Sequence, residues 1–233
     1  MQNTANVSVI RDRIQSVLER IERACERSGR RSRDVTLVVV TKTVPPERIA
    51  EALEAGARDI GENRVQEARD KFPQLALPFT GHLIGRLQTN KAKYVPHLFE
   101  WVHSVDRVEL ARELGRRCLA AGRTLNCLLQ VNVTGEETKQ GVFPDGLAAL
   151  AEAAAEVEGI RVRGLMTMAA LGPPEAELRK TFSSLRRLAE ELAERKLPNV
   201  EMEHLSMGMS GDFEIAVEEG ATMVRVGSAI FGP

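Results

Sequence analysis

Eight strand-like segments that alternate with helix-like segments predict an α/β fold, and their number predicts a single (β/α)8 TIM barrel. The alternation favours a parallel sheet with right-handed crossovers. The chain of 233 residues is long enough for one barrel, and no linker or low-complexity stretch divides it, so we expect residues 1–233 to form one domain. An amphipathic segment before the first strand predicts an extra N-terminal helix.

The order of the elements follows from the spacing of apolar residues and from the residues that end each segment. The predicted N-terminal helix covers 7–28, with one apolar face formed by Val9, Ile14, Val17, Leu18 and Ile21. The run 35–41 is β-branched and apolar on both faces, as in a buried parallel strand. Pro45 and Pro46 then begin a helix that Gly56 ends. Further strands are predicted at 59–63, 78–84, 99–104, 125–133, 160–166, 200–205 and 222–226, and further helices at 64–72, 89–98, 107–121, 144–157, 174–195 and 210–219.

Composition and charge exclude several classes of partner. The net charge of −1 does not favour nucleic acid or an anionic membrane, and an aromatic content of 4% provides no stacking platform. No segment has the length and apolarity of a signal peptide or a membrane span. Cys25, Cys118 and Cys127 form no C-x-x-C pair, so we expect buried or half-buried free thiols in a cytoplasmic protein. We expect a monomer or a weak homodimer.

Lys42 is the first candidate for chemistry, because active sites of such barrels lie at the carboxyl ends of the strands. It follows Val-Val-Val-Thr, where an apolar wall would meet the site. Burial there would disfavour the ammonium form and make the amine a better nucleophile toward a carbonyl. A lysine that simply reaches into solvent from a strand end explains the position equally well.

The loops after the seventh and eighth strands favour the functional interpretation of Lys42. In these barrels a phosphate site is commonly built from those two loops. Glycines let backbone N–H groups approach an anion, and the eighth loop precedes a helix N-terminus. The relevant residues are Ser206, Gly208, Ser210, Gly211, Gly227 and Ser228. Two ordinary small-residue turns are the alternative, but a phosphate site opposite a reactive lysine indicates a Schiff base to a phosphorylated aldehyde.

Other motifs point to no further cofactor. The four histidines, which include His82 and His204, show no H-E-x-x-H motif or close pair, so no metal site is predicted. We expect His82 and His204 to be hydrogen-bonded barrel residues rather than metal ligands. The chain contains neither G-x-G-x-x-G nor G-x-x-x-x-G-K-[ST], which argues against dinucleotide and nucleoside triphosphate sites.

Seven longer motifs occur in order along nearly the whole chain. They are Val-Val-Thr-Lys42, Gly-Glu-Asn63-Arg-Val-Gln-Glu, His82-Leu-Ile-Gly-Arg-Leu-Gln-Thr-Asn-Lys91, His103-Ser-Val-Asp106, Gly164-Leu-Met166, His204-Leu-Ser-Met-Gly-Met-Ser210 and Val224-Arg-Val-Gly-Ser-Ala-Ile-Phe-Gly232. Together they resemble the pyridoxal-phosphate homeostasis protein family, also called the proline synthetase co-transcribed family.

The resemblance implies a barrel like the N-terminal domain of alanine racemase, with one pyridoxal 5′-phosphate (PLP) held as an aldimine on Lys42. It implies a role in intracellular PLP homeostasis, by buffering or delivery of the cofactor to PLP-dependent apo-enzymes, without established turnover. Asn63 matches a residue beside the cofactor, and Arg225 matches an arginine that faces the pyridine nitrogen. Ser206, Gly227 and Ser228 match phosphate-binding positions. The full set of expected cofactor contacts is Lys42, Asn63, His82, Met166, Ser206, Met209, Ser210, Arg225, Gly227 and Ser228.

Two positions depart from the family pattern. Gly81 precedes His82 where a tryptophan is usual, and we expect looser packing there. Ser228 stands where threonine is usual and keeps the hydroxyl, so the expected phosphate contact is retained.

Two enzymatic alternatives share parts of this pattern. A minimal amino-acid racemase needs a base on each face of the substrate α-carbon, and Lys42 can serve only one face. The only tyrosine, Tyr94, falls in the third predicted helix and is a poor second base. Arg225 disfavours a protonated pyridine and so weakens the cofactor as an electron sink, which suits limited racemisation or storage. A Schiff-base phosphosugar aldolase would share the barrel and the lysine but not the longer motifs.

Overall fold

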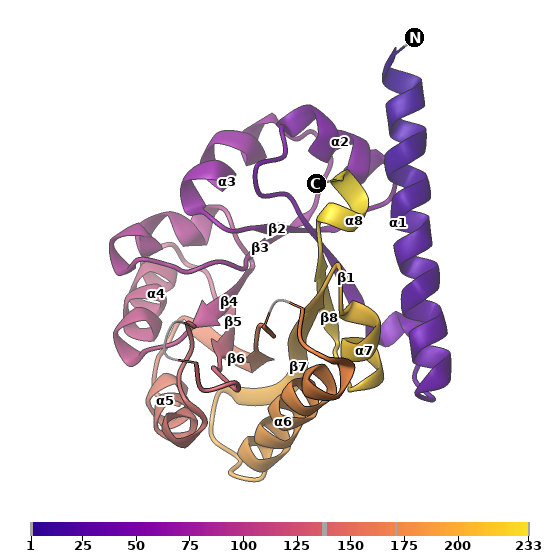
Figure 1. The fold of residues 1–233 in the computed structure, drawn as a ribbon. Helices are drawn as coiled ribbons and strands as arrows, with labels where there is room; N and C mark the ends of the chain where they lie inside the picture. Colours follow the sequence, from indigo (N-terminus) through magenta and orange to yellow (C-terminus); the bar gives the residue numbers. More distant parts are fainter. Residues whose placement is uncertain (1, 137–138, 171, 233) are drawn as a thin grey trace.

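The structure is a computed structural model that describes residues 2–136, 139–170 and 172–232. It confirms the predicted (β/α)8 barrel: eight parallel strands pair in chain order, and the last closes onto the first. Figure 1 shows the helices arranged around this barrel. The strands are β1 (Thr36–Val40), β2 (Asp59–Glu62), β3 (Thr80–Leu83), β4 (Trp101–Val105), β5 (Leu125–Gln130), β6 (Ile160–Met166), β7 (Val200–Met209) and β8 (Met223–Val226).

Helices follow the strands on the outside of the barrel. The α-helices are α1 (Gln2–Arg27), α2 (Pro46–Glu54), α3 (Val65–Lys71), α4 (Val108–Ala120), α5 (Leu147–Ala155), α6 (Glu175–Ala193), α7 (Phe213–Glu218) and α8 (Ser228–Phe231). The 3-10 helices are η1 (Ser32–Asp34), η2 (Phe72–Gln74), η3 (Thr89–His97) and η4 (Pro144–Gly146). The third crossover was expected to be an ordinary helix, but η3 contains Pro96, which has no N–H to donate and disfavours an α-helix.

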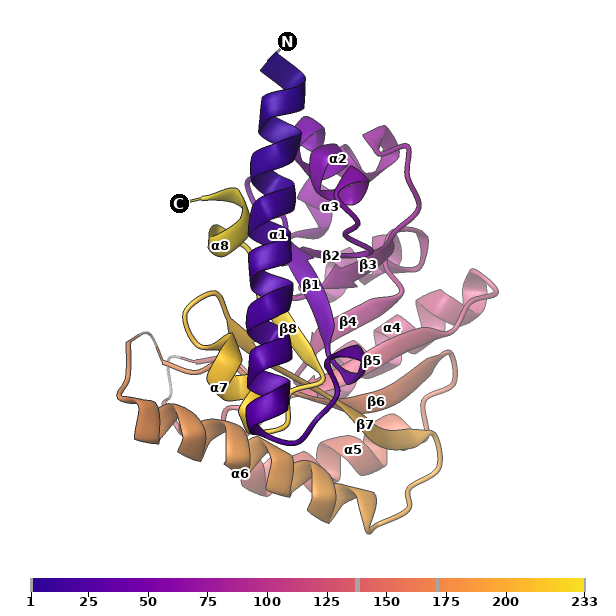
Figure 2. The ribbon, with the colours of Figure 1, turned by 90° about the vertical axis from the view of Figure 1, so that its right-hand side faces the viewer.

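Helix α1 covers the barrel where the ring of helices is thin. The helix that follows β8 has only four residues, and α1 packs against α2, α7 and α8 on that side (Figure 2). Its buried face includes Ile10, Ile14, Val17 and Ile21. Val9 and Leu18 were expected on this face, but both are exposed, so the apolar stripe is narrower than the sequence predicts.

Strand β7 extends four residues beyond its predicted end. The predicted strand ends at 205, whereas the observed strand reaches Met209. Its register against β8 shifts between Ser206, which lies opposite Met223, and Met209, which lies opposite Arg225. This irregularity contains Gly208, whose φ of 89° suits glycine. The loop that reaches the site therefore begins at Ser210.

The core has two parts, one between the sheet and the helices and one inside the barrel. Cys25, Cys118 and Cys127 are buried free thiols, as predicted. Packing at Gly81 is not loose: a Cβ there would lie 2.5 Å from the Leu98 carbonyl oxygen. In the part of the chain that the structure describes, no helix is long and apolar enough to cross a membrane.

Candidate functional site

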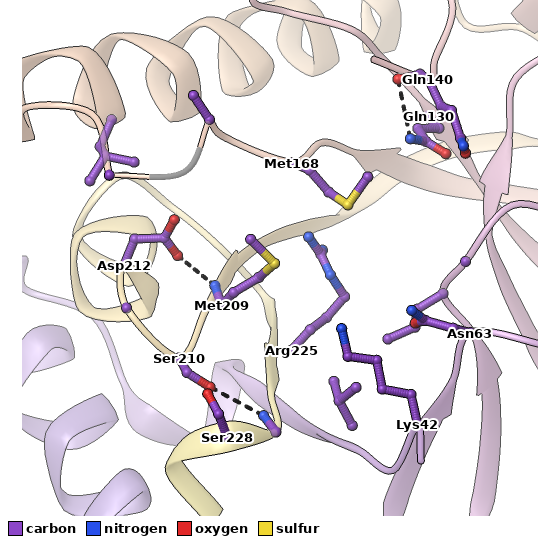
Figure 3. A pocket seen from close by; sticks show the side chains of 18 of the residues that line it. Lys42, Asn63, Gln130, Gln140, Met168, Met209, Ser210, Asp212, Arg225 and Ser228 are labelled. Atoms are coloured by element: carbon purple, nitrogen blue, oxygen red, sulfur yellow. Dashed lines mark hydrogen bonds between the residues drawn. The ribbon is translucent and has the colours of Figure 1, made fainter. Parts of the chain in front are cut away.

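A pocket of about 680 Å³ opens at the carboxyl ends of the strands, where the fold predicts the site. Figure 3 shows side chains from loops that follow several different strands converging on it. Seven of the ten expected cofactor contacts line this pocket: Lys42, Asn63, Met209, Ser210, Arg225, Gly227 and Ser228. The loops after β1, β2, β7 and β8 therefore meet at one place, although they are far apart in sequence.

Lys42 lies in the turn that follows β1. Its side chain extends into the pocket, with Nζ directed toward Arg225 and with Asn63 beside it (Figure 3). The sequence left open whether the lysine is buried or reaches into solvent, and in the structure the residue is exposed. The amine is thus accessible to a molecule that enters the pocket.

A buried network holds the turn that carries Lys42. The Lys71 ammonium donates to the Thr41 carbonyl oxygen at 3.0 Å, to Glu62 Oε1 at 3.0 Å and to Glu67 Oε2 at 2.9 Å. Glu67 Oε2 also accepts the N–H of Thr43, whose φ of 62° lies in the left-handed region. Burial raises the pKa of the Glu62 carboxyl. These contacts fix the backbone on both sides of Lys42.

Ser210 joins the loops that follow β7 and β8. Its hydroxyl oxygen accepts the backbone N–H groups of Gly227 and Ala229, each at 3.3 Å. Ser228 begins the short helix α8, and its side chain lies beside Ser210 in Figure 3. The Ser210 and Ser228 hydroxyl groups therefore lie together at one corner of the pocket.

Arg225 forms part of the pocket wall and is only 4% exposed. Its Nη1 donates to Ser206 Oγ at 2.5 Å, and its Nη2 donates to the Thr167 carbonyl oxygen at 2.9 Å. Burial lowers the pKa of the guanidinium to about 10. Glu203, a carboxylate on the neighbouring strand β7, pairs with Arg163 and not with Arg225.

The structure corrects three of the expected cofactor contacts. His82, Met166 and Ser206 do not line the pocket, and each is fully buried in the barrel. Met166 packs in a cluster with Leu128 and Met223. Ser206 was assigned to a phosphate loop, but it lies within β7. These side chains have no surface that a ligand in the pocket could touch.

Several pocket residues were missed by the sequence analysis. Gln130, Arg86 and Met168 line the pocket, at the ends of strands or in the loops after them. Gln130 could have been found as the last residue of β5, but the strand was predicted to run to 133. Asn132, which falls inside the predicted strand but beyond the observed one, donates to the Glu136 carbonyl oxygen at 2.8 Å and holds the following loop.

Comparisons with known proteins agree with this architecture. Residues 14–233 match the family described as "Alanine racemase, N-terminal domain". The chain is 46% identical over 222 residues to a protein of Aquifex aeolicus named "Pyridoxal phosphate homeostasis protein", covering 95% of this chain and 96% of that one. A protein of Escherichia coli K12 with the same name is 42% identical over 220 residues, covering 93% of each chain.

Solved structures show the same fold. The structure of PipY from Synechococcus elongatus, described as "with PLP bound", superposes with a TM-score of 0.84 at 38% identity, covering 96% of this chain and all of that chain. Alanine racemase from Corynebacterium glutamicum has a TM-score of 0.72 at 14% identity. That match covers 97% of this chain but only 61% of the racemase, which therefore carries additional structure beyond the shared barrel.

Proposed function

We propose that this chain, which belongs to the alanine racemase N-terminal domain family and within it to the pyridoxal phosphate homeostasis proteins, binds PLP and takes part in PLP homeostasis. The observation that carries the proposal is that the side chains of Lys42, Arg225, Ser210 and Ser228 converge on one pocket. A relative of 38% identity has been solved with PLP bound.

The donor set of the pocket fits the three polar parts of PLP. Lys42 supplies an accessible primary amine for the aldehyde carbon. Ser210 and Ser228 supply hydroxyl donors for the phosphate, and Gly227, whose N–H donates to the Ser210 hydroxyl oxygen, lines the same part of the pocket. Arg225 carries only donors, so it suits the lone pair of an unprotonated ring nitrogen. When bound, PLP supplies an electron-withdrawing ring, and a permanent cation beside its nitrogen disfavours the protonation that would strengthen this effect.

We propose that the role is to buffer or deliver PLP rather than to turn over a substrate. Among the described residues that line the pocket there is no tyrosine, histidine or cysteine to face Lys42 as a second base. Asp212 is the one carboxylate among them, and it accepts the Met209 N–H at 2.5 Å. Tyr94 lies on η3 and packs against the outer core. These observations support storage over racemisation.

Absence of turnover can be measured directly. We expect the PLP-loaded protein to leave the α-proton of L-alanine almost unexchanged in deuterated water. Among the described residues that line the pocket, Lys42 is the only amine, and Asp212, the one carboxylate, is held by the Met209 N–H. Mass spectrometry or NMR of the recovered alanine measures the exchange. Rapid exchange accompanied by racemisation would make the protein an amino-acid racemase and would overturn the storage role.

The homeostatic role also implies partners and a location. We propose PLP-dependent apo-enzymes as recipients of the cofactor and a monomer or weak homodimer as the working form. Three buried free thiols support a reducing compartment such as the cytoplasm.

The proposal predicts which amine binds the aldehyde carbon of PLP, namely that of Lys42. Borohydride reduction of the loaded protein, followed by peptide mass mapping, should find the pyridoxyl group on Lys42. The Lys42→Ala variant should remain unlabelled, because no other amine is expected to be held against the pocket in the same way. Labelling mainly at Lys91, Lys93 or Lys139 would contradict the assignment.

A further inference from the structure

Five polar side chains form a continuous hydrogen-bonded chain through the barrel interior. Asp59 Oδ1 lies 2.9 Å from His82 Nε2, and His82 Nδ1 lies 2.9 Å from His103 Nε2. His103 Nδ1 lies 2.9 Å from Ser206 Oγ, which accepts from Arg225 Nη1 at 2.5 Å. The five residues come from β2, β3, β4, β7 and β8, so only the closed barrel brings them together.

The chain connects the two ends of the barrel. Asp59 is the first residue of β2, and the starts of the strands lie at the end opposite the pocket. Its side chain is 26% exposed, whereas His82, His103 and Ser206 are fully buried. Arg225 stands at the other end, in the pocket wall. The three buried members do not line the pocket and have no part in contacting a ligand directly.

The chemistry of its members gives the chain a direction. An ionised carboxylate only accepts hydrogen bonds, so His82 must donate to Asp59 from Nε2. If His82 is neutral, its Nδ1 accepts from His103 Nε2, and His103 Nδ1 then accepts the Ser206 hydroxyl proton. Ser206 Oγ remains free to accept from Arg225. In this arrangement every donor meets an acceptor, and both imidazoles are neutral with the proton on Nε2.

The neighbouring charges support a neutral His103 imidazole. Burial, followed by the nearby His82 and Arg225, holds the pKa of His103 well below its ordinary value. Within the described residues, no carboxylate forms a salt bridge with Arg225, whose two terminal nitrogens meet Ser206 and the Thr167 carbonyl oxygen. A second buried cation beside this guanidinium would be costly.

We propose that Asp59, His82, His103 and Ser206 act as a one-way hydrogen-bond relay that orients the Arg225 guanidinium toward the cofactor ring. This proposal depends on the proposed function in one respect only: it takes the ring in the pocket to be the pyridine ring of PLP. Asp59 fixes the tautomers of both histidines, these fix the Ser206 hydroxyl, and Ser206 then presents a lone pair to Nη1. The four residues are positioning residues, because they act on the ligand only through Arg225.

The histidine tautomers of the ligand-free protein test the relay without any cofactor. Two-dimensional NMR of protein labelled with ¹⁵N-histidine distinguishes Nε2–H, Nδ1–H and the imidazolium. The polypeptide has four histidines. The His97→Gln and His204→Gln variants identify the signals of the two histidines that lie outside the hydrogen-bonded chain. We expect both His82 and His103 to be neutral with the proton on Nε2 at pH 7. An imidazolium at His82 or a proton on His103 Nδ1 would reverse the direction and overturn the proposal.

A substitution at the far end tests whether the relay reaches the pocket. Asp59→Ala should give His103 a mixture of tautomers and weaken PLP binding about tenfold, within the usual range of coupling between distant groups. The PLP analogue with carbon in place of the ring nitrogen should bind the variant and the wild type equally. Glu201→Gln, an exposed carboxylate near the same end of the barrel, is the matched control and should change neither measurement.

The outcomes separate the relay from the proposed function. Equal loss of affinity for PLP and for the analogue, or unchanged tautomers in Asp59→Ala, would show that Asp59 is only structural. If PLP does not bind the wild-type protein, the proposed function is wrong, and the wild-type tautomers still decide the direction of the relay. The wild-type measurement also decides it if Asp59→Ala does not fold.

Discussion

Ser206 and Ser210 lie four residues apart, yet only Ser210 reaches the pocket. Ser206 faces the barrel interior between His103 and Arg225, whereas Ser210 ties the loop after β7 to the loop after β8. Both hydroxyls are hydrogen-bonded, so their chemistry does not distinguish them. The difference in position is what gives Ser210 a direct role and Ser206 an indirect one.

This difference predicts that two serine variants lose ligand affinity in different ways: one loses it selectively for the phosphorylated ligand, and the other loses it equally for both ligands. Ser210→Ala should weaken PLP binding by about 1.5–3 kcal/mol, the contribution of a hydrogen bond to a charged group, and should leave binding of unphosphorylated pyridoxal nearly unchanged. Ser206→Ala should weaken both ligands to a similar extent, because it acts on Arg225 and not on the phosphate. Titration followed by absorbance measures the four affinities.

A phosphate-specific loss in Ser206→Ala, or an equal loss for both ligands in Ser210→Ala, would contradict these assignments. Ser228→Ala serves as a further comparison, since its side chain also lines the pocket. It should resemble Ser210→Ala if both hydroxyls face the same anion.

At the level of elements, α1 completes the outer layer of helices. Because α8 is short, the side of the barrel near β8 and β1 depends on α1 for cover. Ion pairs of Arg20 with Glu214 and of Arg27 with Glu218 join α1 to α7. These pairs are partly exposed and contribute little by themselves, so the apolar face of α1 should supply most of the stabilisation.

Two residues on α1 give a matched test of this role. Ile14 is 4% exposed and Leu18 is 43% exposed, although they lie one turn apart. Ile14→Ala should lower the free energy of unfolding by about 2–5 kcal/mol, as expected for truncation of a buried aliphatic side chain. Leu18→Ala should change it by less than about 0.5 kcal/mol. Urea denaturation measures both, and similar effects in the two variants would show that α1 does not pack as described.

At the scale of the whole molecule, closure of the sheet decides which residues become neighbours. Lys42 and Arg225 come from opposite ends of the chain and meet because β1 pairs with β8. The same closure brings Asp59 into one hydrogen-bonded chain with Arg225 across the barrel interior. The pocket and the relay are therefore both properties of the barrel and of no single segment.

The order of the elements, the barrel and most of the loops at the site could be predicted from the amino-acid sequence alone. This was possible because alternation of apolar patterns, turn glycines and strand ends are local features. The sequence identified Lys42, Ser210 and Arg225, which line the pocket, but it also placed Ser206 in a loop.

Which side chains face the pocket and which face the barrel interior could not be predicted in this way. That choice depends on strand length and register, and the irregularity at Gly208 shifts β7 against β8. A change in register moves side chains relative to their neighbours, and it depends on pairing between distant strands. Ser206 was placed in a loop but lies within the extended β7, and His82 and Met166 also lie within the barrel. His82 and Ser206 are linked there to Arg225 through His103.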